Sequence, residues 1–447
     1  MSITETGMIM EDIYGVIASA TRDDSSFNSE YGALIHTPDD DIEPYLLKIV
    51  ETMRNYNKYV GDYVVVTMEI MGGVFIKDIY PHRDSLEISI VRTNKSNLKI
   101  HEEKRYKAIL INNNKNVYGS EYTSSTKEEL NRRFMVTAEF QCLDLVVEGL
   151  RAILVDGIYE SVLLKDVIQA EFTEKINNLA INGEVPDVNI DIVEPVNNNE
   201  IKQLVVPTGV KILDFPSYLQ NTIYGVYNAG LGTYVQTYND KPTIFVYPLF
   251  DVNRFDMVDK KMIVYFTPNV KFDHIETTYD IDGDILKVLA GTNLKSEDDA
   301  ENEFIDQGDS YIRVKPDLMM NRNVMTSTSG MTLDSDTQVE GLKFKERRDG
   351  MSIPTYLGLE SNVYKHRSMT ARKALASYSF VWYYSKPDLI YPGMPLKYVY
   401  EDRDGGIKEL LGVVQATATV VDIVKGTRST YVVFYANKPI VVENNLE

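Results

Sequence analysis

Apolar and polar positions alternate with a period of two along residues 392–436. This alternation is typical of half-buried antiparallel strands, and a meander of this length closes most simply as a small barrel. Gly405 and Gly406 supply the positive φ that a tight hairpin between the first two strands requires. The strands predicted here cover 396–400, 410–420 and 429–436.

A second strand-rich region lies between residues 59 and 143. About five strands are expected within roughly 80 residues, enough for another barrel-sized sheet. Phe140 and Cys142 lie on the apolar face of the last and longest of them. The predicted strands cover 63–68, 74–80, 86–90, 106–111 and 134–142.

Three segments have the spacing of amphipathic helices. The first is Tyr45–Arg54, preceded by aspartates 39–41. These aspartates suit the positive end of a helix dipole, although calcium ligation is an alternative. Asp144 is a suitable N-cap for a second helix that runs to Leu154. A third helix is predicted over 164–176, with one apolar face made by Leu164, Val167, Ile168, Phe172 and Ile176.

The predicted fold class is mainly β (α+β), with two small antiparallel β-barrel-like domains joined by helical and extended connecting segments. The polar stretch 294–350 is expected to be mobile or to be ordered by a partner. The expected regions are an N-terminal segment with a helix (1–58), a first barrel-like domain (59–143), a helical connector and linker (144–205), a β-rich middle domain (206–293), the polar loop region (294–350) and a C-terminal barrel-like domain (351–447).

The formal charge of −20 restricts the partners of this chain. A protein this acidic repels nucleic acid and anionic lipid, which disfavours DNA binding by charge attraction. The single cysteine, Cys142, excludes an intrachain disulfide, and its position on an apolar face favours a packing role. Residues 1–10 do not resemble a signal peptide, and no apolar run has the roughly 20 residues of a membrane span. We therefore expect synthesis in a cytoplasm and no membrane insertion.

The sequence contains no convincing motif of an enzyme active site or a metal site, so no catalytic residue, cofactor or metal is predicted. The five histidines have no metal-ligand spacing. The stretch Asp280–Asp284 resembles a calcium loop, but Gly283 and Gly291 stand at the wrong positions, and a β-turn explains it better. The glycines at 225, 230 and 232 lack the Gly-Lys-Ser/Thr of a phosphate loop and favour a turn-rich loop.

Tyrosine is abundant, with 30 tyrosines against 15 phenylalanines. Tyrosine is enriched both in strands and at protein–protein interfaces, so strand content alone is an alternative explanation. The predicted interface residues are Tyr224, Tyr227, Tyr234, Tyr398, Tyr400 and Tyr431.

Three stretches of the sequence resemble the hub proteins of bacteriophage tails and baseplates. They are Arg133–Leu143, then Asp214–Gln220 with Tyr227–Tyr234, and Pro392–Tyr398. The resemblance implies two similar β-barrels per chain and a ring of three chains, whose six barrels give pseudo-sixfold symmetry. Such a ring joins the sixfold tail tube to the threefold spike and lets the genome pass through its bore.

The first functional hypothesis is therefore a structural virion protein of the tail or baseplate, without catalysis. The partners that the resemblance implies are further copies in a homotrimer, the tail tube protein, a central spike or tail lysin, and other baseplate proteins, with DNA only in transit. A tail-associated cell-wall hydrolase and a carbohydrate-binding adhesin are the alternatives. Mass and symmetry discriminate between them, because a hub forms a ring whereas a lytic enzyme works as a monomer.

Overall fold

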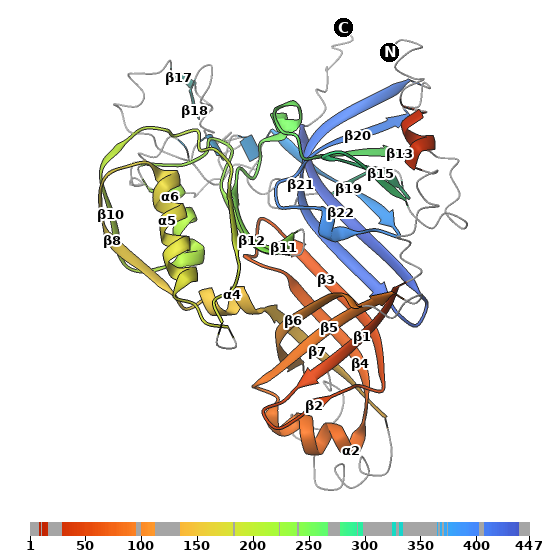
Figure 1. Cartoon of the computed structure of the whole chain (residues 1–447). Coiled ribbons are helices and arrows are strands. Elements are labelled where there is room, and N and C mark those ends of the chain that lie inside the picture. The colour runs from red at the N-terminus through yellow and green to blue at the C-terminus, as the bar shows by residue number, and fades with distance from the viewer. Residues whose placement is uncertain are drawn as a thin grey trace, which may run out of the picture.

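We describe a computed structural model of the chain, in which three lobes meet at a common centre (Figure 1). We call them the N-terminal lobe (β1–β7), the connector lobe (β8–β12 with α4–α6) and the C-terminal lobe (β13–β16 and β19–β22). The structure describes residues 9, 11–16, 29–94, 100–111, 135–181, 184–222, 224–238, 241–266, 278–292, 294–297, 324–327, 330–333, 364, 367–368, 371–372, 374–401 and 406–437.

The N-terminal lobe is an antiparallel sheet in the order β3-β4-β7-β6-β5-β1-β2. Side chains at alternating positions, such as Val66, Met68 and Phe140, are fully buried between its curved walls. The strands are β1 (Ser29–His36), β2 (Asp41–Ile42), β3 (Leu46–Asn55), β4 (Tyr63–Met71), β5 (Leu86–Asn94), β6 (Ile100–Ile111) and β7 (Met135–Asp144).

Two elements of this lobe differ from the predictions. Residues 46–55 form strand β3, not a helix. The strand has a register shift between Leu47 and Ile49, which displaces the following apolar residues by one position. The spacing of the apolar residues in the sequence therefore resembles that of a helix. Residues 74–80, predicted as a strand, lie in the helical turns α2 (Gly72–Val74), η2 (Phe75–Ile79) and η3 (Tyr80–His82). Phe75 and Ile79, four residues apart, bury one side of these turns.

The C-terminal lobe contains the predicted hairpin and last strand, as β20 (Pro395–Glu401), β21 (Ile407–Asp422) and β22 (Thr427–Asn437). It is not purely antiparallel, because β13 (Lys261–Phe266) runs parallel to both β15 and β20. Residues 402–405 of the predicted hairpin tip lie outside the described residues. The other strands are β14 (Tyr279–Asp282), β15 (Ile285–Ala290), β16 (Lys295–Glu297) and β19 (Leu375–Tyr383).

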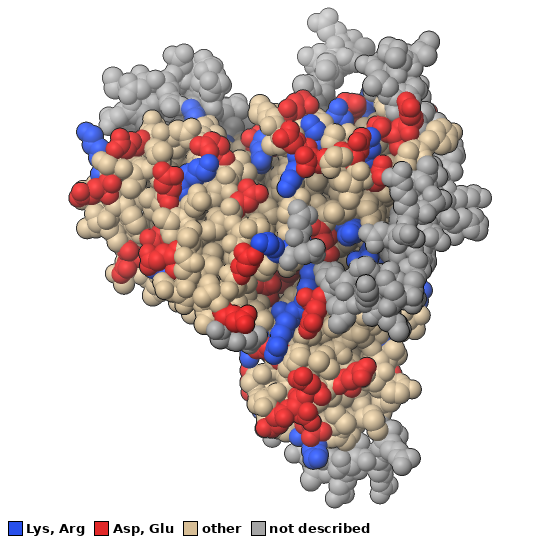
Figure 2. All heavy atoms as spheres, in the orientation of Figure 1, with Lys and Arg blue, Asp and Glu red and all other residues tan. Residues whose placement is uncertain are grey.

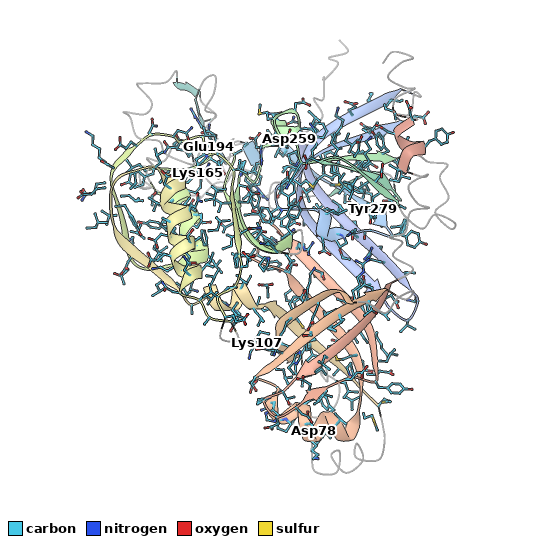
Figure 3. The ribbon with its side chains drawn as sticks, viewed as in Figure 1. Asp78, Lys107, Lys165, Glu194, Asp259 and Tyr279 are labelled. Atoms are coloured by element: carbon cyan, nitrogen blue, oxygen red, sulfur yellow. The ribbon has the colours of Figure 1, made fainter. Side chains whose placement is uncertain are left out.

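The connector lobe packs helices against the long antiparallel pair β8–β10 and the small sheet β9-β12-β11 (Figure 1). The predicted third helix is α5, and its apolar face lies in the core of this lobe. Lys165 of α5 donates to Glu194, which follows β9, at 2.5 Å (Figure 3). The elements are α4 (Leu145–Leu150), β8 (Leu154–Val162), α5 (Leu164–Asn177), β9 (Asn189–Ile192), β10 (Ile201–Lys211), η4 (Ile212–Asp214), α6 (Phe215–Asn221), β11 (Gly232–Tyr238) and β12 (Lys241–Tyr247).

Asp144 caps α4, as the sequence predicts. Its Oδ1 accepts the backbone N–H groups of Val146 at 2.8 Å and Val147 at 3.2 Å. The helix ends at Leu150, and Leu154 already belongs to β8, so the helix is shorter than expected.

A single strand connects the two large sheets. β21 is 16 residues long and pairs with β20 and β22 in the C-terminal lobe. Its far end, Ala416–Asp422, also pairs with β3 of the N-terminal lobe. The two strand-rich regions therefore belong to one continuous sheet. This sheet also spans the domain boundary expected at residue 293, because β13 pairs with β20.

The mainly β class predicted from the sequence is confirmed, but the strand ladders of the described residues do not close into barrels. In the C-terminal lobe the gap between β15 and β19 is bridged by a 2.8 Å backbone bond from Gly291 N–H to the Val381 carbonyl. Of the polar region 294–350, only 294–297 and the pair β17 (Val324–Ser327) and β18 (Gly330–Leu333) are described. The prediction of a mobile segment therefore falls mostly outside the described residues.

Candidate functional site

A buried charged cluster lies where the three lobes meet. Arg54, at the end of β3, donates through Nε and Nη2 to the carboxylate of Asp62 at 3.0–3.1 Å. The same guanidinium reaches η7 (Pro387–Leu389) of the C-terminal lobe. There it donates to the Pro387 carbonyl at 3.0 Å and to Asp388 Oδ1 at 2.9 Å. Its side chain is only 3% exposed, so these acceptors replace the water that the cation loses.

Asp62 carries the cluster into the connector lobe. Its Oδ1 accepts a hydrogen bond from the Tyr234 hydroxyl of β11 at 3.1 Å. Tyr234 packs edge-on against Tyr56, with 4.8 Å between ring centroids, and the Tyr247 hydroxyl donates to the Tyr56 carbonyl at 3.0 Å. We call Arg54, Asp62, Tyr234 and Asp388 the junction clamp, because together they connect all three lobes.

Opposing effects set the protonation of the clamp. Burial by itself would lower the pKa of Arg54, but Asp62 and Asp388 outweigh it, and the pKa lies well above its usual value. Burial would raise the pKa of Asp388, but Lys104 and Arg54 hold it well below the ordinary value of an aspartate. Lys104 Nζ lies 3.2 Å from Asp388 Oδ1. The charged forms of Arg54 and Asp388 are therefore the stable forms at neutral pH.

A cavity of about 80 Å³ opens beside the junction clamp. Its walls come from strands of both large sheets, so its residues lie far apart in the sequence. Four of its side chains are cationic (Arg54, Arg92, Lys104 and Arg428), and two are anionic (Asp62 and Asp388). The side chains that line the cavity thus include more cations than anions, in a chain whose net charge is −20. The other lining residues are Tyr31, Val50, Thr52, Ile90, Tyr106, Pro387, Thr419 and Val421.

Strand register explains this set of neighbours. Val50 and Thr52 of β3 lie opposite Val421 and Thr419 of β21. Arg428 of β22 lies opposite Val421 on the other side, so one row across three strands forms the floor of the cavity. Figure 2 shows acidic side chains scattered over the visible face, with Lys and Arg side chains at the waist where the N-terminal lobe meets the rest. Lys107 of β6 marks this waist in Figure 3.

Three of the six predicted interface tyrosines lie inside the cores of this chain. Tyr227 is 1% exposed, and Tyr234 and Tyr398 are 0% exposed. Tyr227 donates to the Val193 carbonyl, and Tyr398 lies stacked on Phe434 with 6.0 Å between ring centroids. Burial raises the pKa of all three phenols, which stay protonated donors.

The other three predicted tyrosines keep part of their surface exposed. The Tyr224 hydroxyl donates to the Gln203 carbonyl at 2.8 Å, and the Tyr431 hydroxyl donates to Ser379 Oγ at 2.7 Å. Tyr400 packs against Tyr398 at a ring distance of 6.0 Å. The structure does not bring the six tyrosines together in one patch, since they come from the connector and the C-terminal lobes.

The other candidate groups have structural surroundings. Cys142 is 1% exposed in the core of the N-terminal lobe, and burial raises its pKa to about 12, which fits the packing role predicted for it. The Asp280–Asp284 stretch is the β14–β15 hairpin, and Gly283 has a φ of +61°. In the part of the chain that the structure describes, His, Cys, Asp and Glu side chains form no group of three that could hold a metal ion.

The described helices are too short or too polar to cross a membrane. No family model matches the sequence, and no curated protein matches it.

Several solved structures match this chain over most of its length. The tail protein from Neisseria meningitidis MC58 has 9% identity and a TM-score of 0.46, over 91% of this chain and 96% of that chain. The 43 kDa tail protein of prophage MuSo2 from Shewanella oneidensis has 7% identity and a TM-score of 0.46, with the same coverage. The E. coli c3393 protein, a type VI secretion system component, has 9% identity and a TM-score of 0.41, over 88% and 73%.

Sequence reasoning missed the junction clamp and its cavity. Arg54 was placed on a helix, and its partners Pro387 and Asp388 are more than 330 positions away. The sequence offers no local signal for the cluster, since Arg54 stands among polar residues such as Thr52 and Asn55.

Proposed function

We propose that this chain is a structural virion protein of a bacteriophage tail or baseplate, a hub that forms a ring between the tail tube and the central spike. The observation that carries the proposal is the continuous sheet through β21, which the junction clamp fixes at its centre. A ring subunit must hold its two sheets at a constant angle when neighbours attach to either one. A shared strand and a buried Arg54–Asp62 ion pair, whose partners come from all three lobes, meet that requirement.

The arrangement of sheets suits a ring of three chains. Each chain contributes two strand-rich lobes, the N-terminal and the C-terminal lobe, and three chains would contribute six. This is the number that a sixfold tube needs on one side, while the chain count matches a threefold spike on the other. The tail tube protein, a spike or tail lysin and other baseplate proteins are the proposed partners.

The charge of the chain supports a role in which DNA passes without binding. The net charge is −20, and acidic side chains are distributed over the face shown in Figure 2. A DNA duplex would be repelled from such a surface rather than held on it. We therefore propose DNA in transit, and not as a ligand.

Contacts between copies are proposed at the partly exposed tyrosines Tyr224, Tyr400 and Tyr431. A tyrosine ring gives a large contact area at a small entropic cost, and its hydroxyl keeps a partner. The fully buried Tyr227, Tyr234 and Tyr398 contribute by keeping the sheets that carry these contacts rigid.

The native mass tests the proposal directly. The chain has a mass of 50.9 kDa, so a homotrimer is expected at three times this value by light scattering, alone or with its tube or spike partner. Electron microscopy of the assembled species should show a ring with six similar densities. A monomer that remains monomeric with both partners present would refute the hub.

Surface variants locate the contacts. We expect Tyr400→Glu and Tyr431→Glu to shift the mass toward the monomer while the thermal melting temperature changes little. The matched control is Tyr45→Glu, a tyrosine 69% exposed in the N-terminal lobe and outside the proposed contacts. A cell-wall digestion assay on the same preparations addresses the hydrolase alternative, since release of glycan or peptide would contradict a purely structural role.

A further inference from the structure

The outer face of the C-terminal sheet contains a row of apolar side chains. Tyr265 of β13 lies opposite Leu289 of β15 on one side and opposite Val399 of β20 on the other. Residues one position away in each strand, such as Val264, face the core of the lobe, so the row points away from that core. The three side chains are nevertheless buried, at 3%, 0% and 4% exposure. Another part of the chain must therefore cover them.

A short helix covers this row. Its described residues are 9 and 11–16, and it lies beside β13 and β20 in Figure 1. Ile9, Ile13 and Val16 have the i, i+4, i+7 spacing of an apolar helix face, and they pack in one cluster with the row. Tyr14, between them in the sequence, is 63% exposed. We call this element the docked helix.

The sheet also recognises one carboxylate of the docked helix. The Tyr265 hydroxyl donates to Asp12 Oδ2 at 2.6 Å, and Lys287 Nζ donates to Asp12 Oδ1 at 2.7 Å. The Lys287 side chain is 13% exposed and also donates to Asp282 at 2.9 Å. We call Tyr265, Lys287, Leu289 and Val399 the docking face. Its chemistry selects an amphipathic helix that has a carboxylate beside its apolar residues.

The docked helix is connected to the N-terminal lobe but binds the C-terminal lobe. Twelve residues, 17–28, separate it from β1, whereas Tyr265 and Lys287 are 253 and 275 positions away from Asp12. Twelve residues of chain span up to about 40 Å, while a compact chain of this length has a radius of gyration of about 22 Å. The helix can therefore reach the C-terminal lobe of an adjacent copy as well as its own.

Docking on an adjacent copy costs little free energy. The contacts of Asp12, Ile13 and Val16 are the same whether the docking face belongs to their own chain or to a neighbour, which is the usual basis of segment exchange between copies. A helix this short is only marginally stable in water, so its order depends on whichever docking face it contacts.

We propose that in the assembled protein the docking face binds the docked helix of a second copy, so that each chain holds the next. The occupant is a copy of this chain because every copy carries a helix with the carboxylate and the apolar residues that the face recognises. This exchange rests on the ring proposed above, for which it supplies a contact between copies. In a closed ring each chain gives one helix and receives one, so every docking face is covered.

Complementary variants test whether the helix docks on its own chain or on a neighbour. Lys287→Gln keeps the carboxylate of Asp12 but removes the amine that contacts it. Asp12→Asn keeps the amine but removes the carboxylate. The two full-length variants are co-expressed, purified together and treated with a carbodiimide, which joins a carboxylate and a lysine amine in contact as an amide. An amide between Asp12 and Lys287 can then form only between copies.

Mass spectrometry of the digested protein identifies the amide. We expect the amide between Asp12 and Lys287 in the wild type and in the co-expressed pair. The positive control is the amide between Lys165 and Glu194, which lie 2.5 Å apart within the connector lobe, and it should form in every preparation. The Asp12 amide in the wild type but not in the pair would show that each helix docks on its own chain, which overturns the exchange. Its absence from both would overturn the docking.

The native mass distinguishes failure of the exchange from failure of the hub. A trimer that lacks the amide between copies removes the exchange and leaves the hub. A monomer removes both.

A substitution on the apolar side of the docked helix measures how it contributes to the contact. Ile13→Gln, added to the Lys287→Gln chain of the pair, should lower the yield of the amide about ten-fold or more, because the burial of an isoleucine side chain is lost. The matched control is Tyr14→Gln, at the next position and 63% exposed, where the yield should be unchanged. Equal yields from the two variants would contradict docking through the apolar row.

Discussion

The guanidinium of Arg54 and the carboxylate of Asp62 form a two-point ion pair at 3.0–3.1 Å, with both side chains at most 10% exposed. Asp62 also accepts the Tyr234 hydroxyl, and Arg54 also binds Asp388. One buried pair therefore connects the N-terminal, connector and C-terminal lobes. Its planar, two-point geometry is specific to arginine, so lysine cannot reproduce it.

Replacing Arg54 by methionine should destabilise the protein strongly. The substitution leaves Asp62 buried without its cation, and breaking a buried pair in this way costs about 3–5 kcal/mol. Urea unfolding of the wild type and the variant measures the difference. The control is Arg105→Met, whose partner is Glu87 in a pair 40% and 23% exposed, where about 0–1 kcal/mol is expected. A loss of less than about 1 kcal/mol at Arg54 would show that the clamp does not hold the lobes.

Acid should weaken the junction through Asp388. Lys104 and Arg54 outweigh burial and hold the pKa of Asp388 well below its usual value, although 31% of its side chain is exposed. A carboxyl group with a lowered pKa stabilises the fold above its unfolded pKa of about 3.9, and this contribution is lost as the pH falls toward the folded pKa.

The measurement is the stability of the wild type relative to Asp388→Asn, followed by denaturant unfolding at several pH values. The difference should be constant between about pH 5 and pH 7 and should shrink below about pH 4. A difference that grows on acidification would contradict the sign of the shift.

The thiol of Cys142 should be inert in the native protein. It is 1% exposed, and burial raises its pKa to about 12, so almost no thiolate exists at pH 8. A thiol reagent should react with one equivalent per chain in urea, because the sequence has one cysteine, and should show no measurable reaction without urea. Rapid stoichiometric labelling of the native protein would mean that the core of the N-terminal lobe opens readily.

The cap of α4 should contribute measurably to stability. Asp144→Ala removes the acceptor of two backbone N–H groups and should cost about 1 kcal/mol, within the range of about 0.5–2 that such caps show. Asp144→Asn keeps an acceptor oxygen and should cost less. Asp166→Ala, in the first turn of α5 without a capping hydrogen bond, is the control and should change stability by a few tenths of a kcal/mol.

Two glycines of the β20–β21 hairpin should differ in how much their replacement by alanine lowers the stability of the protein. A Cβ at Gly412 would lie 2.5 Å from the Tyr435 carbonyl oxygen and 2.7 Å from the Phe434 ring, so Gly412→Ala should cost about 1–3 kcal/mol or more. Gly406 does not have the positive φ predicted for it from the sequence, and a Cβ there meets nothing within 4 Å, so Gly406→Ala should stay within about 0.5 kcal/mol of the wild type. Thermal unfolding distinguishes the pair, and equal effects would contradict the packing around Gly412.

Local patterns in the sequence were sufficient for the fold class and for much of the C-terminal lobe. The β20–β21 hairpin, the α5 helix and the Asp144 cap depend on neighbours within a few residues, and their patterns are intact. The strand β3 was mistaken for a helix because its bulge after Leu47 breaks the alternation. The parallel pairing of β13 with β15 and β20 leaves no local signal, since the partners are set by crossovers of the chain.

The junction clamp and its cavity could not be predicted from local sequence patterns, because their residues are far apart in the sequence. Arg54, Lys104, Asp388 and Arg428 meet only after two sheets have paired through β3 and β21. Composition suggested tyrosine surfaces, yet the rings of Tyr227, Tyr234 and Tyr398 lie in the cores, where their hydroxyls donate to carbonyl or carboxylate oxygens.

The pairing of Arg54 with Thr417 has a consequence for biosynthesis. While the ribosome is still making the later lobes, β3 is the edge strand of the N-terminal sheet. The backbone N–H and C=O groups on the side that later faces β21 then have no hydrogen-bond partner. Such an edge invites pairing with other nascent chains until residues 416–422 emerge and occupy it. A chain whose translation stops before this point would keep the edge of β3 unpaired. The solubility of chains truncated at different positions therefore shows when β21 pairs with β3.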